Sequence, residues 1–151
     1  MQLAGKHVVN AHASKIWTML MDMVTLAKIV PGISSLEKKT ENSYVSTFSI
    51  KMGPVSGSFA GNLQMDDISE QKGFTLNIHQ NSKIGNAKAA IKVDLCPLED
   101  NKTEVAFDGD AKLSGLLAGI GQRVLSGVAH TMSKQFFINL ENELSASKNG
   151  N

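Results

Sequence analysis

The class of fold is decided by residues 55–65, VSGSFAGNLQM, in which two kinds of position alternate. Val55, Phe59, Leu63 and Met65 share one face with two glycines, and small or polar residues occupy the other face. A period of two is typical of a β-strand with one buried and one wet face. The stretch therefore predicts an antiparallel sheet that is exposed to water on one side.

The same period extends outward from this strand over residues 33–113, which predicts a meander of antiparallel strands. Turn residues separate the strands at Glu41-Asn42, Gly53-Pro54, Lys72-Gly73, Gly85-Asn86 and Asp100-Asn101. Residues 2–10 predict one further strand at the start of the chain. Two short helices follow it, one capped by Ser14 and one capped by Asp22 that stops at Val30 before Pro31-Gly32.

The remaining long segment, 115–146, contains no proline and has apolar residues at helical spacing. One face of this predicted helix carries Leu117, Ile120, Gly121, Val124, Leu125, Val128, Met132 and Phe136. Because the buried face of the sheet needs a cover, we expect the helix to lie across it. The result is an α+β fold in one domain, residues 1–146, with a frayed C-terminus at 147–151.

Composition excludes several classes of function. The 15 Lys and Arg nearly balance the 14 Asp and Glu without forming a basic run, which disfavours a nucleic-acid partner. No stretch has the roughly 18 apolar residues that a membrane span requires. The single cysteine, Cys96, has no partner for an internal disulfide. These features predict a soluble cytoplasmic protein.

No catalytic site is predicted. His12, His79 and His130 fall at solvent-facing positions, and only His7 has a register that could point inward, where a hydrogen-bonded core histidine is the simpler interpretation. Zinc and calcium motifs are absent, and the glycines around Pro54 lack the lysine of a phosphate loop. We therefore expect no enzymatic activity, no metal and no cofactor.

Glycines in the covering helix suggest an internal cavity. Gly121 lies on the inward face of the helix, where the missing side chain would leave room above the sheet. Close packing of helix on sheet is the competing interpretation. The residues expected to line the cavity are Phe48, Phe59, Leu63, Phe74, Leu76, Ile78, Ile91, Phe107, Leu117, Ile120, Gly121, Val124, Leu125, Val128 and Met132. Such a lining would select a hydrophobic ligand.

Motifs spread over nearly the whole chain resemble those of one family. They are Ile16-Trp17, Leu20, Asp22, Leu26, Pro31-Gly32, Gly53-Pro54-Val55, Phe59-Ala60-Gly61, Ile84-Gly85, a strand ending at Leu95, the run from Gly115 to Leu125, and Phe136-Phe137 before Leu140. In their order and spacing the chain resembles the CoxG family, named for the G-type subunit of carbon monoxide dehydrogenase, within the START-related (SRPBCC) polyketide cyclase and lipid-transport superfamily.

The resemblance implies a helix-grip fold, with a seven-stranded antiparallel sheet wrapped around a long C-terminal helix. It also implies an accessory protein of a molybdenum-containing carbon monoxide dehydrogenase or related hydroxylase, with a cavity that holds a quinone or a lipid. Many family members carry a membrane-engaging extension, whereas this sequence ends soon after Leu144. Peripheral contact with the inner face of the membrane stays open. A cyclase- or hydrolase-like enzyme and a purely structural assembly factor are the alternatives.

Overall fold

The computed structural model describes residues 1–149, and its centre is one antiparallel sheet of seven strands. The strands are ordered β1-β7-β6-β5-β4-β3-β2, so each pairs with its neighbour in the chain except that β1 returns to pair with β7. Their bounds are β1 Gln2–Val9, β2 Ile33–Thr40, β3 Ser43–Met52, β4 Val55–Ser69, β5 Gly73–Ser82, β6 Gly85–Pro97 and β7 Thr103–Leu113. The predicted sheet is confirmed.

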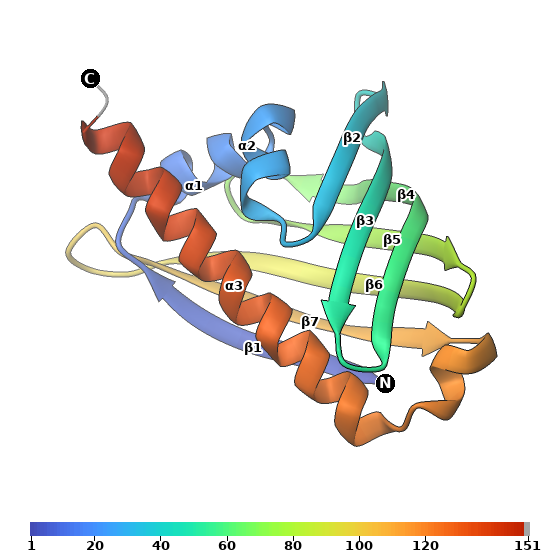
Figure 1. Cartoon of the computed structure of the whole chain (residues 1–151). Coiled ribbons are helices and arrows are strands. Elements are labelled where there is room, and N and C mark those ends of the chain that lie inside the picture. The colour runs from blue at the N-terminus through green and yellow to red at the C-terminus, as the bar shows by residue number, and fades with distance from the viewer. Residues whose placement is uncertain (150–151) are drawn as a thin grey trace.

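Four helical segments complete the fold: α1 Ala13–Leu20, α2 Met23–Ile29, a 3₁₀ turn η1 Gly115–Gly119, and α3 Gln122–Asn149. Figure 1 shows the sheet curling around α3, which crosses it diagonally and reaches α1 and α2 with its C-terminal half. The helix-grip arrangement, with two short helices after the first strand, is thus confirmed. Of the predicted frayed segment, 147–151, residues 150 and 151 lie outside the described part of the chain.

The covering segment is not one continuous helix, as the sequence pattern predicted. Gly121 has a φ of 105° between η1 and α3, a conformation that favours glycine because it brings a Cβ into conflict with the backbone. The first turn of α3 then begins where Leu125 N donates to Gly121 O at 3.1 Å. The chain therefore changes direction at Gly121, and the helical wheel drawn from residue 115 does not apply across the break.

The two short helices begin differently. Asp22 caps α2 as predicted, because its carboxylate accepts hydrogen bonds from the Thr25 backbone N–H at 3.2 Å and from Thr25 Oγ1 at 2.7 Å. These hydrogen bonds, the one from the hydroxyl first, hold the pKa of Asp22 below its ordinary value. The predicted cap of α1 is wrong. His12 is the N-cap there without a side-chain hydrogen bond, and Ser14 lies inside the helix.

One end of the interior is solidly packed. Val9, Ile16, Ile29 and Leu140 have no exposed surface, and Trp17, Phe74 and Phe137 are also buried there. We call these seven residues the packed end. Two polar contacts fasten α3 to it: Asn139 Nδ2 donates to Ile29 O at 3.1 Å, and His7 Nε2 lies 3.1 Å from Glu141 Oε1.

Candidate functional site

A hollow of about 320 Å³ lies between the sheet and the N-terminal half of α3, partly open to solvent. We call it the inner cavity. It is lined by Met1, Leu26, Val30, Ile33, Leu36, Tyr44, Phe48, Ile50, Val55, Phe59, Leu63, Met65, Leu76, Ile78, Gln80, Ala87, Leu113, Leu117, Leu125, Val128, Ala129 and Met132. Its volume is within the range of about 300–1,000 Å³ typical of small-molecule sites.

The periodicities of the sequence explain how this lining forms. On α3 the cavity is reached by Leu125, Val128, Ala129 and Met132, which share one face because they are spaced three and four residues apart. On the strands, alternate residues point inward, so β4 contributes Val55, Phe59, Leu63 and Met65. Nearly every surrounding side chain is therefore apolar.

The structure brings many of the predicted cavity residues together. Those that line the inner cavity are Phe48, Phe59, Leu63, Leu76, Ile78, Leu117, Leu125, Val128 and Met132. They come from β3, β4, β5, η1 and α3. The site is thus assembled from segments that are far apart in the chain.

Two predicted aromatic residues lie elsewhere. Phe74 belongs to the packed end, where its ring meets Trp17 edge to face with the ring centroids 6.0 Å apart. Phe107 faces α3 near its C-terminal half, with its ring centroid 6.4 Å from that of Phe137. Both point to the inner side of the sheet as predicted, but the inner side also covers the packed end.

The other predicted residues outside the lining are Ile91, Ile120, Gly121 and Val124. Ile91 pairs with Leu76 and Gly109 in the sheet and is half-buried. The remaining three lie at the break between η1 and α3, which turns Val124 outward to 40% exposure and leaves Gly121 exposed. The prediction that Gly121 makes room over the sheet is therefore wrong.

Sequence reasoning missed two parts of the lining. Leu26, Val30, Ile33 and Leu36 come from α2 and β2, whose position over the cavity no local pattern reveals. Gln80 is the second part. It continues the inward register of Leu76 and Ile78 on β5, and a polar residue at such a position was the available signal.

Tyr44 places a phenol in the wall of the inner cavity. Its side chain is buried at 4% exposure, and that burial raises the pKa of the phenol, with the negative charge of Asp22 adding to the effect. A raised pKa keeps the hydroxyl neutral at physiological pH. Tyr44 thus adds no charge to the lining.

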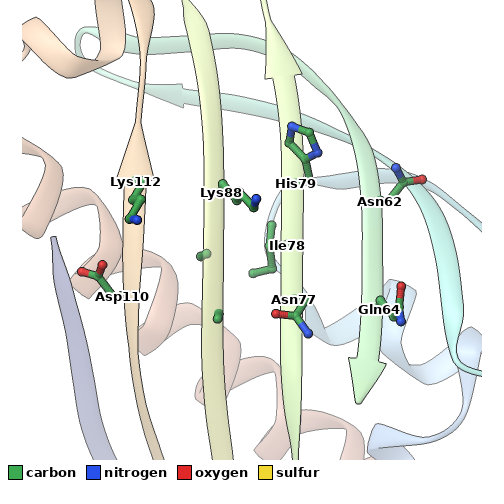
Figure 2. Close-up of a pocket in the computed structure, with 10 residues that line it drawn as sticks. Asn62, Gln64, Asn77, Ile78, His79, Lys88, Asp110 and Lys112 are labelled. Atoms are coloured by element: carbon green, nitrogen blue, oxygen red, sulfur yellow. The ribbon is translucent and has the colours of Figure 1, made fainter.

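A second depression of about 470 Å³ lies on the opposite face of the sheet. Figure 2 shows its side chains projecting from neighbouring strands, among them Asn62, Gln64, Asn77, His79 and Lys88. Gln64 Nε2 donates to Asp66 Oδ1 at 2.9 Å, and Asn77 Nδ2 donates to the other oxygen of Asp66. This face is the wet side that the alternation predicted, and His79 lies on it as expected.

His7 occupies the inward register of β1 but not the inner cavity. Its ring stacks on Phe137 with the centroids 4.6 Å apart and the planes 18° apart, and Glu141 pairs with Nε2. The side chain of His7 is 41% exposed. The interpretation of a histidine held by neighbouring side chains is thus supported by a ring contact and a hydrogen bond.

Within residues 1–149, no group of three or more His, Cys, Asp or Glu side chains comes together in a way that could hold a metal ion. In the same part of the chain, none of the helices combines the length and the apolar character needed to cross a membrane.

The family model of CoxG, the G-type subunit of carbon monoxide dehydrogenase, matches residues 5–145, which is nearly the whole fold. The chain belongs to the CoxG family. Among curated proteins, none matches the sequence significantly. The family therefore rests on the match of the full domain and on the motifs that run from Ile16 to Leu140.

Solved structures agree with the family. A conserved protein from Geobacillus kaustophilus superposes with a TM-score of 0.94 at 28% identity, with 97% of each chain covered. A START superfamily protein from Mycobacterium smegmatis has a TM-score of 0.73 at 12% identity, covering 95% of this chain and 97% of that one. The Zhui aromatase/cyclase from Streptomyces sp. R1128 has a TM-score of 0.72 at 12% identity, covering 97% and 94%. The last two share their fold with this CoxG family member.

Proposed function

We propose that the inner cavity binds a hydrophobic small molecule, a quinone or the acyl chain of a lipid, and that the protein carries this ligand without transforming it. On this proposal residues 1–146 act as one binding domain in the cytoplasm. The observation that carries the proposal is the inner cavity itself: about 320 Å³ of space with an almost wholly apolar lining. Such a space is filled more favourably by an apolar ligand than by water.

Burial can supply the affinity. Each methylene moved out of water contributes about 0.8 kcal/mol, so a chain of about ten carbons gains on the order of 8 kcal/mol before ordering costs are subtracted. The nine predicted residues that line the cavity, among them Phe59, Leu125 and Val128, would provide the contacts.

A cyclase-like enzyme is the main alternative, since the Zhui aromatase/cyclase has the same fold. General acid–base catalysis requires a titratable side chain within hydrogen-bond reach of the substrate. The residues that line the inner cavity include no aspartate, glutamate, histidine, lysine or cysteine, and the pKa of Tyr44 is raised. This lining favours the carrier, because the phenol of Tyr44 alone offers no acid and base pair.

The family supplies the proposed partner. Membership in the CoxG family supports an accessory role for a molybdenum hydroxylase of the carbon monoxide dehydrogenase type, to which the carried molecule would be delivered. A purely structural assembly factor would need no internal space, so the cavity favours the carrier over this alternative as well.

The first experiment identifies what the cavity retains. The protein is purified from its own host, its intact mass is measured by native mass spectrometry, and the complex is then extracted with organic solvent. We expect a hydrophobic molecule at about one per chain in the extract. A fully occupied preparation that yields only polar molecules would contradict the proposal.

A pair of variants ties the molecule to the inner cavity. Val128→Phe adds volume inside the cavity, whereas Ile138→Phe adds it on a face of α3 that is 42% exposed. We expect the first variant to lose at least tenfold in affinity for a quinone analogue, and the second to bind like wild type. Equal binding by both variants would place the ligand elsewhere.

A further inference from the structure

One polar group is set into the apolar wall of the inner cavity. The register across three strands places Ser46 of β3 opposite Gly61 of β4, and Gly61 opposite Gln80 of β5. Because Gly61 has no side chain, the amide of Gln80 reaches across β4, and its Nε2 donates to Ser46 Oγ at 2.9 Å. A Cβ at position 61 would lie 1.8 Å from the carbonyl oxygen of His79, so only glycine fits there.

The amide of Gln80 is half satisfied. Gln80 is 5% exposed and lines the cavity, and Ser46 is fully buried beside it. Among the described residues, Gln80 Oε1 is the one buried side-chain nitrogen or oxygen atom without a hydrogen-bond partner. An unpaired buried acceptor costs about 1–3 kcal/mol, so a core with no ligand would be more stable with an apolar residue here.

Building on the proposed function, we propose that the natural ligand carries a hydroxyl group that donates a hydrogen bond to Gln80 Oε1. The class is a neutral hydrophobic alcohol or phenol, which includes a reduced quinone. A charged headgroup does not fit this site, because the lining side chains offer no opposite charge to compensate its desolvation.

The hydroxyl suits this pair better than other neutral groups do. A serine hydroxyl can accept from the amide or donate to it, so the amide can present either its oxygen or its nitrogen to the cavity. A ligand hydroxyl can pair with both atoms. A ketone or an oxidised quinone only accepts, and it leaves Oε1 unpaired in the arrangement that the structure shows.

The test compares 1-decanol with 2-decanone, two chains of equal length that differ in hydrogen-bond donation. Each is titrated against a bound fluorescent naphthalene sulfonate in wild type, Gln80→Met and Gln64→Met. The control residue Gln64 lies on the outer face of the sheet, outside the inner cavity. Using the ratio of the two affinities within one protein cancels the difference in hydrophobicity between the probes.

We expect the ratio of decanol to decanone affinity to be about tenfold higher in wild type and Gln64→Met than in Gln80→Met, the size of one hydrogen bond to an otherwise unpaired acceptor. The affinity of Gln80→Met for decanone should be unchanged or higher. Gln80→Leu serves as a second variant without the amide in case Gln80→Met folds poorly.

An equal ratio in all three proteins would overturn the inference, and so would a preference for decanone that depends on Gln80. In both cases the probes still bind, so the proposed carrier function would survive. Failure of folded wild type to bind either probe would instead contradict the proposed function itself. The two ideas therefore fail separately.

Discussion

The two halves of α3 belong to different kinds of interior. Its C-terminal half buries Phe137, Leu140 and Leu144 against β1, α1 and α2, and Leu140 has no exposed surface. Its N-terminal half presents Leu125, Val128 and Met132, all half-buried, to the inner cavity. The same helical periodicity thus produces a solid core at one end and a hollow at the other.

The difference lies in what covers each half of the helix. At the packed end, α1 and α2 fill the space beside α3, and Asn139 and His7 fasten the helix in place. At the other end, the chain enters α3 through the exposed turn at Gly121, and no further helix of the described chain fills the space. We infer that the packed end holds the fold together while the hollow end is free to serve binding.

The largest expected effect separates two buried phenylalanines of the sheet. Phe74→Ala removes a ring packed on Trp17 and should cost about 3–5 kcal/mol in the free energy of unfolding. Phe59→Ala removes a ring that borders the inner cavity, so fewer contacts are lost and the cost should be smaller. Urea unfolding of both variants measures this difference.

Ligand affinity should change in the opposite order. Phe59→Ala alters the wall of the cavity and should change the affinity for a quinone analogue, whereas Phe74→Ala should leave that affinity as it is. If both variants lose equal stability and bind like wild type, the interior is uniform and the comparison of its two ends fails.

A smaller effect is expected at the break before α3. Gly121→Ala places a Cβ at a φ of 105°, which costs about 1–2 kcal/mol although nothing lies within 4 Å of that position. Gly119→Ala is the matched control, because it has the same open surroundings without the positive φ. Thermal unfolding should show a lower Tm for the first variant only.

Binding distinguishes this strain from a cavity effect. Neither Gly119 nor Gly121 lines the inner cavity, so both variants should bind a hydrophobic probe like wild type. A Gly121→Ala variant that gains stability would mean that the break is not fixed by this glycine, and that the two halves of the covering segment can join into one helix.

Most of the fold could be predicted because it rests on local signals. Alternation in residues 55–65 and its repetition through 33–113 specify antiparallel strands, and Asp22 before Pro31-Gly32 specifies the short α2. The break at Gly121 could not be predicted, because a glycine at helical spacing has the same pattern whether its φ is negative or positive.

The site was harder to predict than the fold. A residue's register tells which side of the sheet it faces, and on that basis Phe59 and Phe74 are equivalent. Their separation into cavity and packed end depends on where α1, α2 and the far half of α3 lie, which is a property of the tertiary structure. Gln80 was overlooked for a simpler reason, since attention to apolar residues passes over a polar residue in their register.

The smallest expected effect is at Asp22, where the two regions meet. The helix that it caps sends Ile29 into the packed end and Leu26 to the cavity wall. Asp22→Ala removes the acceptor for the Thr25 N–H and should cost about 1 kcal/mol, whereas Asp22→Asn keeps an acceptor and should cost less. If α2 serves both regions, the alanine variant should also bind a hydrophobic probe more weakly; unchanged binding would assign α2 to the packed end alone.

The pH dependence of this cap has a definite sign. Hydrogen bonds from Thr25 lower the pKa of Asp22 in the folded protein, so its charged form stabilises the fold above the unfolded pKa of about 3.9, and that contribution is lost as the pH falls through the folded pKa. Asp22 lies near the surface, so solvent screening keeps the contribution small. The Tm of wild type minus that of Asp22→Asn should therefore be positive at pH 7 and shrink toward pH 3. A difference that stays constant over this range would show that the cap acts through its geometry alone, with no part for its charge.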